Sequence, residues 1–218
     1  MAAPSGAVVQ RRVTGSTLGT DEHTVVGPRL ARQVASAVAA LHQLPPQILA
    51  GRVPGLAEWR EQVIDITEVA LPATPGFLPA AESVVLDRWW EMFGAYLHGI
   101  DPAGAVPVHG DLWQENMLTR DGQLTAVLDW ETCGLGDRAV DLAGLWYLDD
   151  RFGSQILDHY QHLPGHRDAQ LPDRVGWFRV ARELTGVAWS VRHHDDAALA
   201  ESTAKLRGVL HTTLNKTD

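Results

Sequence analysis

The residues with the clearest chemical potential are two aspartates and an asparagine in the middle of the chain. Asp111 and Asn116 lie in one short polar segment, and Asp129 follows a little further along. Phosphoryl transfer requires a carboxylate that orients and deprotonates the attacking hydroxyl, and oxygen ligands for the Mg²⁺ ion that bridges the phosphates. Proteins hold Mg²⁺ with one or two carboxylates, phosphate oxygens and water. The three residues therefore predict a site in which Asp111 is the base and Asn116 and Asp129 hold Mg²⁺.

These residues belong to a segment that has the pattern of a small β-hairpin. Short apolar runs alternate there with turn residues. The runs are Val106–Val108, Asn116–Thr119 and Leu124–Leu128. Asp121-Gly122 separates the last two runs and is typical of a tight hairpin turn. Because such a turn reverses the chain, we expect Asp129 to lie beside the loop that carries Asp111.

The rest of the chain has mostly the spacing of amphipathic helices. Apolar residues recur at helical intervals after Pro28, a residue suited to the first turn of a helix. Helices are expected over residues 28–44, 58–70, 82–100, 138–149, 153–162, 173–193 and 196–213. Residues 7–13 are typical of a short strand, followed by a loop over 14–19. The fold class is thus expected to be α+β, mainly helical with a β-hairpin insert.

Three motifs occur in a fixed order around this hairpin. They are His109-Gly110-Asp111-Leu112 with Asn116, then Asp129 after the hairpin, then Gly136-Asp137 with Asp141-Leu142-Ala143. Together they resemble the signature of the aminoglycoside/macrolide phosphotransferase and choline kinase family. The set is also similar to the His-Arg-Asp, Asn and Asp-Phe-Gly motifs of protein kinases, with Gly110 in the place of the arginine.

The resemblance implies a role for each of these residues. It implies Asp111 as the catalytic base and Asn116 and Asp129 as the Mg²⁺ ligands that bind the cofactor, with ATP or GTP as the phosphoryl donor.

The resemblance also implies supporting residues around this site. It implies His109 as a structural member of the loop. Asp137 and Asp141 match the family's downstream pair, and we expect them to fix the catalytic loop and the start of the next helix, where an acidic residue suits the helix dipole.

The same resemblance divides the chain into two parts. Residues 28–218 are expected to form a protein-kinase-like C-terminal lobe, with the catalytic hairpin at 106–130 and substrate-side helices at 138–213. Residues 1–27 look like one residual strand of the N-terminal lobe and its hinge. No Gly-rich phosphate loop or Lys precedes residue 28, and the first Lys is Lys205. We therefore expect most of the N-terminal lobe to be absent, little activity without it, and either self-association or a separate N-lobe partner.

The function that these motifs predict is ATP-dependent transfer of a phosphoryl group to a hydroxyl of a small molecule. Resistance-type and biosynthetic phosphotransferases are the nearest analogy, and an aminoglycoside- or macrolide-type acceptor is expected. Two alternatives stay open. The chain could be a fragment or pseudokinase that acts as a binding module, or the scaffold could serve a non-kinase biosynthetic reaction with Asp111 as a general acid/base.

Composition excludes several other classes of function. The formal net charge is -9 and no basic cluster occurs, which argues against nucleic-acid binding. No stretch approaches the ~18 apolar residues that a membrane span needs. Cys133 is the only cysteine, which excludes an intramolecular disulfide and a Cys-rich zinc site. The N-terminus lacks the pattern of a signal peptide, so a cytoplasmic protein is expected.

Some residues near the predicted site keep two interpretations. Trp113 and Trp130 flank it, and each either belongs to the core or contacts the substrate. Four helical carboxylates either face water or line an acidic substrate pocket. They are Asp149, Asp150, Glu183 and Glu201.

Overall fold

The computed structural model describes residues 13–18, 27–49 and 51–213. Most of them lie in the helices α1 Pro28–His42, α2 Leu56–Ala70, α3 Ala80–Gly99, α4 Ala139–Ala143, α5 Asp150–His162, α6 Leu171–His193 and α7 Asp196–Thr213. Short 3-10 helices occur at η1 Pro46–Ile48, η2 Leu71–Gly76, η3 Pro102–Gly104, η4 Gln114–Asn116 and η5 Gly144–Trp146. The strands are β1 Ser16–Thr17, β2 Val106–Val108, β3 Met117–Arg120, β4 Gln123–Val127 and β5 Gly134–Gly136. The strand expected at 7–13 lies outside the described residues except for Val13, which is not in a strand.

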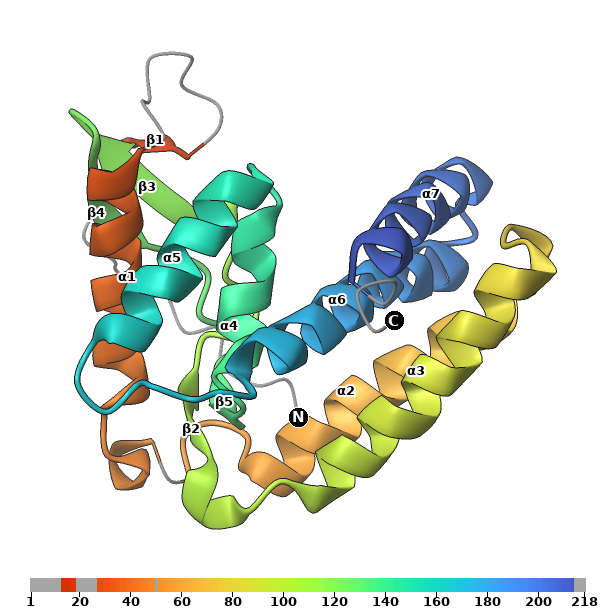
Figure 1. The fold of residues 1–218 in the computed structure, drawn as a ribbon, viewed down its shortest axis with the longest axis horizontal. Helices are drawn as coiled ribbons and strands as arrows, with labels where there is room; N and C mark the ends of the chain where they lie inside the picture. The colour runs from red at the N-terminus through yellow and green to blue at the C-terminus, as the bar shows by residue number, and fades with distance from the viewer. Residues whose placement is uncertain (1–12, 19–26, 50, 214–218) are drawn as a thin grey trace, which may run out of the picture.

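The helices form two groups around the strands (Figure 1). On one side α1 packs against α5 and against the hairpin strand β4. On the other side α2, α3, α6 and α7 lie together, and α6 contacts both α2 and α7. The short helix α4 lies between the groups and packs against α6 and α5. Because α6 reaches from this centre to the outer helices, it can carry side chains into both regions.

The first helix shows how the core is built. α1 begins at Pro28, and its apolar residues Leu30, Val34 and Val38 are almost fully buried. The facing helix α5 contributes Phe152 and Ile156, which are also buried. Burial of a large apolar side chain stabilises a fold by roughly 1.5–3 kcal/mol. The helical spacing in the sequence therefore identified the face of α1 that packs inward.

The hairpin β3–β4 forms as predicted. Asp121 and Gly122 make the turn, with φ values of 54° and 67°. A positive φ at both residues is the pattern of a two-residue type I′ turn, which matches the twist of the strands. Met117 pairs with Val127, and beyond that pair the Leu128 N–H donates to the Asn116 carbonyl at 2.8 Å. The hairpin thus brings the backbones of residues 116 and 128 together at its open end.

One strand lies where a loop was predicted. Within residues 14–19, Ser16–Thr17 forms β1 and pairs antiparallel with β3, so the sheet order is β1-β3-β4. The next residue, Leu18, is fully buried, and its N–H donates to the Met117 carbonyl at 2.9 Å. The prediction of a loop was wrong because the free edge of β3 supplies hydrogen-bond partners that local sequence does not reveal.

The helix predicted at 138–149 is interrupted. α4 ends at Ala143, and the chain continues as the 3-10 helix η5 before α5 begins at Asp150. At Gly144 a Cβ atom would lie 2.1 Å from the Leu112 carbonyl oxygen. The backbone of this helix therefore approaches the segment after Asp111 so closely that only glycine fits.

A second small sheet was not predicted. β5 pairs antiparallel with β2, and Val108 lies opposite Gly134. β5 contains two glycines, which have low strand propensity, so its sequence gave no strand pattern. Its Leu135 N–H donates to the Pro54 carbonyl at 3.0 Å, so pairing with other segments holds it in place. None of the helices in the described ranges has the length and apolar character that a membrane crossing would require.

Candidate active site

The segment His109–Asn116, called the catalytic loop below, is fixed at its start by a buried carboxylate. The main-chain N–H groups of His109 and Gly110 donate to the two carboxylate oxygens of Asp141, at 2.9 and 2.8 Å. Asp141 is fully buried in α4 and also lies 3.1 Å from Nε2 of His42. The Tyr160 hydroxyl lies 2.7 Å from His42 Nδ1. A chain of hydrogen bonds from Tyr160 through His42 therefore orients Asp141 toward the loop.

The imidazole of His109 joins the loop to the end of the hairpin. The ring is fully buried, and its Nε2 lies 2.7 Å from the Leu128 carbonyl oxygen. A carbonyl only accepts hydrogen bonds, so Nε2 carries the proton. Nδ1 is then free to accept from the Asp111 N–H at 3.3 Å. His109 thus connects the residue before Asp129 with Asp111, and its contacts are those of an orienting group.

Gly110 occupies a conformation that few other residues adopt. Its φ is +85°, and a Cβ atom there would lie 2.5 Å from the Thr132 carbonyl oxygen. The Thr132 hydroxyl also donates to the His109 carbonyl at 2.9 Å. A side chain at position 110 would push residues 109 and 132 apart, so the Gly in this motif has a steric cause.

Asp111 and Asn116, which were expected to share one compact site, lie in contact. The Asn116 side-chain Nδ2 donates to the Asp111 carbonyl at 2.8 Å and to the Asp111 Oδ2 at 3.2 Å. Asn116 is largely buried, whereas the Asp111 side chain keeps 38% exposure. Because Nδ2 is used by Asp111, the Asn116 Oδ1 remains available as an acceptor or as a metal ligand.

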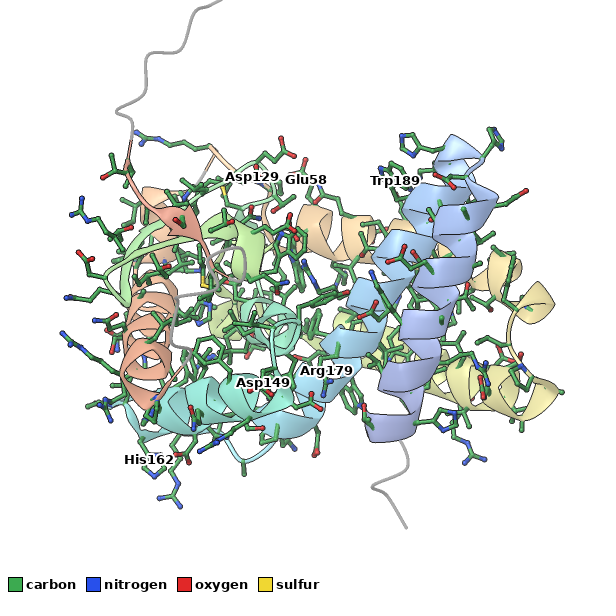
Figure 2. The ribbon with its side chains drawn as sticks, turned by 90° about the horizontal axis from the view of Figure 1, so that it is seen from above. Glu58, Asp129, Asp149, His162, Arg179 and Trp189 are labelled. Carbon is green, nitrogen blue, oxygen red and sulfur yellow. The ribbon has the colours of Figure 1, made fainter. Side chains whose placement is uncertain are left out.

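Asp129 follows the last strand of the hairpin. Leu128 bonds to Asn116 through the main chain, so residue 129 begins directly beyond this open end. Asp129 is exposed, and its φ of 60° places it in the left-handed region, which Asp tolerates better than most residues. Figure 2 shows it on the opposite side of the view from His162, the last residue of α5. No hydrogen bond to its carboxylate occurs within the described ranges.

The Asn116 and Asp129 oxygens suit Mg²⁺ better than they suit a metal ion whose ligands all come from the protein. Across residues 13–18, 27–49 and 51–213, no group of three His, Cys, Asp or Glu side chains could hold a metal ion. The Asn116 Oδ1 and the Asp129 carboxylate are hard oxygen donors without competing partners in that same part of the chain. Mg²⁺ commonly takes only one or two protein ligands and completes its shell with phosphates and water.

Sequence reasoning missed Arg182. This α6 residue places Nη1 2.8 Å from the Asp111 Oδ1. Its guanidinium carbon also lies 5.5 Å from the ring centre of Trp113 and 5.0 Å from that of Tyr147. Nothing in the local sequence links a residue in the middle of a helix to a loop so far away along the chain. Only the packing of α6 against α4 could reveal the contact.

Asp111 borders a pocket of about 240 Å³ between the catalytic loop and the last two helices. Its lining residues are Asp111, Trp113, Tyr147, Arg182, Glu183, Thr185, Gly186, Ser202 and Lys205. We call it the loop–α6–α7 pocket. It places two aromatic rings, two cations and two carboxylates around a space next to Asp111, so it is mixed in charge and not acidic.

Glu183 is the buried carboxylate of this pocket. It is 7% exposed, and burial raises the pKa of its carboxyl group above the ordinary value, which a hydrogen bond from Tyr147 and the neighbouring cations partly offset. Burial, and then the charge of Glu183, raise the pKa of the Tyr147 hydroxyl. Of the four helical carboxylates considered from sequence, Glu183 is the one that lines this pocket.

The other three helical carboxylates each have a hydrogen-bond or ion-pair partner. Asp149 caps the start of α5 by accepting from the Arg151 N–H at 3.1 Å. Asp150 pairs with Arg179 at 3.3 Å, and Glu201 pairs with Lys205 at 2.8 Å. Figure 2 shows Arg179 on α6 and Asp149 at the start of α5. These contacts are those of surface helix residues.

The two tryptophans have different surroundings. Trp113 lines the loop–α6–α7 pocket. Trp130 is 44% exposed, lies 4.6 Å from the His109 ring centre and donates from Nε1 to the Val127 carbonyl at 3.1 Å. Only Trp113 therefore lies where it would meet a molecule bound beside Asp111.

Asp137 connects helices around the site. It accepts from the Ala139 N–H at 2.7 Å at the start of α4 and from Arg174 Nε at 2.9 Å. The Tyr96 hydroxyl of α3 also donates to it. Arg174 makes a second ion pair with Asp168 at 2.8 Å. The described partners of Asp137 thus link α3 to α4, which carries Asp141, and to α6, which carries Arg182.

The chain is similar to known phosphotransferases in sequence and in fold. The model of the family described as "Phosphotransferase enzyme family" matches residues 2–178. The viomycin phosphotransferase of Streptomyces vinaceus is 33% identical over 117 residues, which make up 52% of this chain and 40% of that protein. The thiamine kinase of Salmonella typhimurium is 28% identical over 107 residues, 44% of this chain and 39% of that protein. The match spans less than half the length of either relative.

A solved phosphotransferase structure has a similar fold. The GDP complex of wild-type aminoglycoside 2'-phosphotransferase-IIIa superposes with a TM-score of 0.70, covering 93% of this chain and 69% of that chain. The two sequences are 19% identical, so this likeness concerns the fold. It confirms the expected α+β architecture, a mainly helical, protein-kinase-like lobe.

Proposed function

Because this chain belongs to the phosphotransferase enzyme family, we propose that it transfers the terminal phosphoryl group of ATP or GTP to a hydroxyl group of a small molecule. The observation that carries the proposal is the position of Asp111. Asn116 holds its carboxylate at 3.2 Å, and the loop–α6–α7 pocket opens directly beside it. A pocket of about 240 Å³ has room for part of a small acceptor next to a base.

The chemical step assigned to the chain is a proton transfer. An acceptor hydroxyl in the pocket donates its proton to the Asp111 carboxylate while its oxygen bonds to the terminal phosphorus. The bond between that phosphorus and the bridging oxygen breaks, and a nucleoside diphosphate leaves. Such a base must lie within hydrogen-bond reach of the hydroxyl, and the exposed fraction of Asp111 faces the space where the acceptor would bind.

Asn116 and Asp129 are the residues that would hold Mg²⁺. When bound, the ion would neutralise the charge of the phosphates. The Asn116 amide has a second task, because its Nδ2 keeps Asp111 in place. Buried His109 and Asp141 orient the loop through hydrogen bonds, and neither residue lines the pocket.

The acceptor class is proposed from the relatives. Viomycin, thiamine and aminoglycosides appear in their names, and antibiotic modification, and hence resistance, is the role that we propose first. Thiamine kinase gives a metabolic candidate of the same chemistry. The matched part spans about 40% of the two curated relatives, so their activities are proposals for this chain. We also propose that the enzyme is cytoplasmic.

The proposal is tested by product analysis. The purified chain is incubated with Mg²⁺, ATP or GTP, and viomycin, an aminoglycoside, a macrolide or thiamine, both alone and with an added N-terminal lobe from a relative. Mass spectrometry of the acceptor should show one added phosphoryl group. Asp111→Asn should retain nucleotide binding and lose turnover by roughly 10²–10⁴-fold, as removal of a general base does.

The control is Asp158→Asn on the exposed face of α5, which should turn over like the wild type. Equal turnover by Asp111→Asn and the wild type would refute the assignment of the base. Nucleotide binding without transfer to any acceptor, in both preparations, would favour the binding-module alternative.

A further inference from the structure

The two carboxylate oxygens of Asp111 are held from opposite directions. Asn116 of the same loop donates to Oδ2 at 3.2 Å, and Arg182 of α6 donates to Oδ1 at 2.8 Å. A carboxylate with one partner rotates about its Cβ–Cγ bond, whereas two partners on different oxygens fix its plane. The shorter contact is the one from Arg182, in which both the donor and the acceptor are charged, so the residue more distant in the sequence makes the stronger bond.

Arg182 is itself held tightly. Its guanidinium lies near the rings of Trp113 and Tyr147, at 5.5 and 5.0 Å from their centres, which is the range of cation–π attraction. Its side chain keeps 19% exposure, and its Nε is buried without a partner in the described part of the chain. Its guanidinium carbon lies 3.5 Å from the point that a Cβ of Gly144 would occupy. Both rings and the α4–η5 junction thus restrict where this cation can go.

We propose that Arg182 is a positioning residue of the phosphotransferase site. By holding Oδ1 it fixes the plane of the Asp111 carboxylate, so that the remaining lone pairs point at the acceptor hydroxyl in the loop–α6–α7 pocket. The inference rests on the proposed function, in which Asp111 is the base. Pre-orientation of a reacting group lowers the barrier because the entropy is lost before the reaction begins.

Arg179 provides a matched comparison on the same helix. It lies one turn before Arg182, its guanidinium carbon is 5.4 Å from the ring centre of Trp146, and it pairs with Asp150 at 3.3 Å. The setting is chemically the same, an arginine between an indole and a carboxylate. Its carboxylate partner, however, is a surface residue with 72% side-chain exposure and does not belong to the catalytic loop.

The kinetic test uses Arg182→Ala, Arg182→Lys and Arg179→Ala, with transfer to an acceptor that the wild type accepts. Arg182→Ala should lower kcat by about 10²-fold, the loss that a misplacement of ~1 Å produces, with little change in the KM of the acceptor. Added guanidinium ion should restore part of the kcat of Arg182→Ala. It should not stimulate Arg182→Lys, whose ammonium occupies the space without the planar fork. Arg179→Ala should keep the wild-type kcat.

The decisive kinetic control is the Asp111→Asn background. A residue that acts through Asp111 adds nothing once the base is gone, so Asp111→Asn with Arg182→Ala should be as slow as Asp111→Asn alone. A wild-type kcat in Arg182→Ala, or an equal further loss of rate in the Asp111→Asn background, would overturn the inference.

A second readout does not depend on turnover. In ¹⁵N NMR spectra, the side-chain Nη signals of Arg182, identified by their loss in Arg182→Lys, should shift in Asp111→Asn and stay in place in Asp158→Asn. Unchanged signals in Asp111→Asn would show that Arg182 does not hold the carboxylate, and the inference would fall. If the wild type transfers nothing but the signals shift, the proposed function fails while the contact on which positioning depends stands.

Discussion

The main-chain N–H of His109 donates to the Asp141 carboxylate across 2.9 Å, so the catalytic loop is attached to α4 through a buried charge. The second oxygen of Asp141 accepts from Gly110, and His42 contacts the first. The loop therefore depends on a residue that never reaches the pocket. The position of the loop therefore follows from the burial of α4.

Asp141→Asn should destabilise the protein. The asparagine has one acceptor oxygen where the carboxylate has two, so at least one of the donors around it loses its partner in a fully buried place. We expect the free energy of unfolding to fall by about 3 kcal/mol, within the range for a broken buried charge interaction. Urea denaturation measures this change. Asp158→Asn on exposed α5 should alter stability by less than about 0.5 kcal/mol, and an equally small effect of Asp141→Asn would contradict the account.

Asp129→Asn should weaken Mg²⁺-dependent nucleotide binding and leave stability unchanged. Asn also adopts positive φ readily, so the substitution removes the charge without straining the backbone. Calorimetric titration with nucleotide should show a loss of affinity exceeding the roughly tenfold that follows when a residue supporting a metal ligand is removed.

The matched control is Asp121→Asn, which changes an exposed aspartate at positive φ in the hairpin turn. It should bind nucleotide as the wild type does. Equal binding by Asp129→Asn, with and without Mg²⁺, would rule out Asp129 as a ligand.

Glu183 should make the stability depend on pH. Burial raises the pKa of its carboxyl group in the folded state above the ordinary value of 4.5, so the folded protein binds a proton that the unfolded chain has already released. Its contribution to stability is complete below the unfolded pKa and is lost as the pH rises through the folded pKa. Glu183→Gln removes this loss and should therefore be more stable relative to the wild type near neutral pH than at acidic pH.

Urea denaturation at a pH below 4.5 and near neutral pH tests the sign. Glu201→Gln serves as the control, because the Glu201 side chain is 69% exposed and should show no such difference. A Glu183→Gln protein whose stability relative to the wild type does not rise with pH would contradict the burial argument.

Local pattern was enough for much of this fold. The apolar spacing after Pro28 predicted α1, and Asp121-Gly122 predicted the hairpin that brings residue 129 to the open end beside Asn116. The contact between Asp111 and Asn116 was predictable because both lie in one short loop. In each case the determining interactions join residues near each other in the sequence.

Long-range contacts explain the failures. The break at Gly144 is imposed by the Leu112 carbonyl, and β5 exists because β2 offers it a partner. Arg182 lies in a helix that was predicted, but its contact with Asp111 depends on how α6 crosses α4. Helical periodicity reports which residues face inward, and it does not report which distant carboxylate a residue on that face will meet.

The two sides of the pocket beside Asp111 differ in how much room they leave for larger side chains. On the catalytic-loop side, the Leu112 carbonyl lies so close to Gly144 that there is no room for a methyl group. A larger residue at position 144 would therefore destabilise the fold. On the helix side the lining includes the small residues Thr185, Gly186 and Ser202, and a Cβ at Gly186 would meet only the Ser202 side chain, with Oγ at 3.0 Å and Cβ at 3.5 Å. Side chains on α6 and α7 can therefore change the shape of this pocket without disturbing the contact between Leu112 and Gly144.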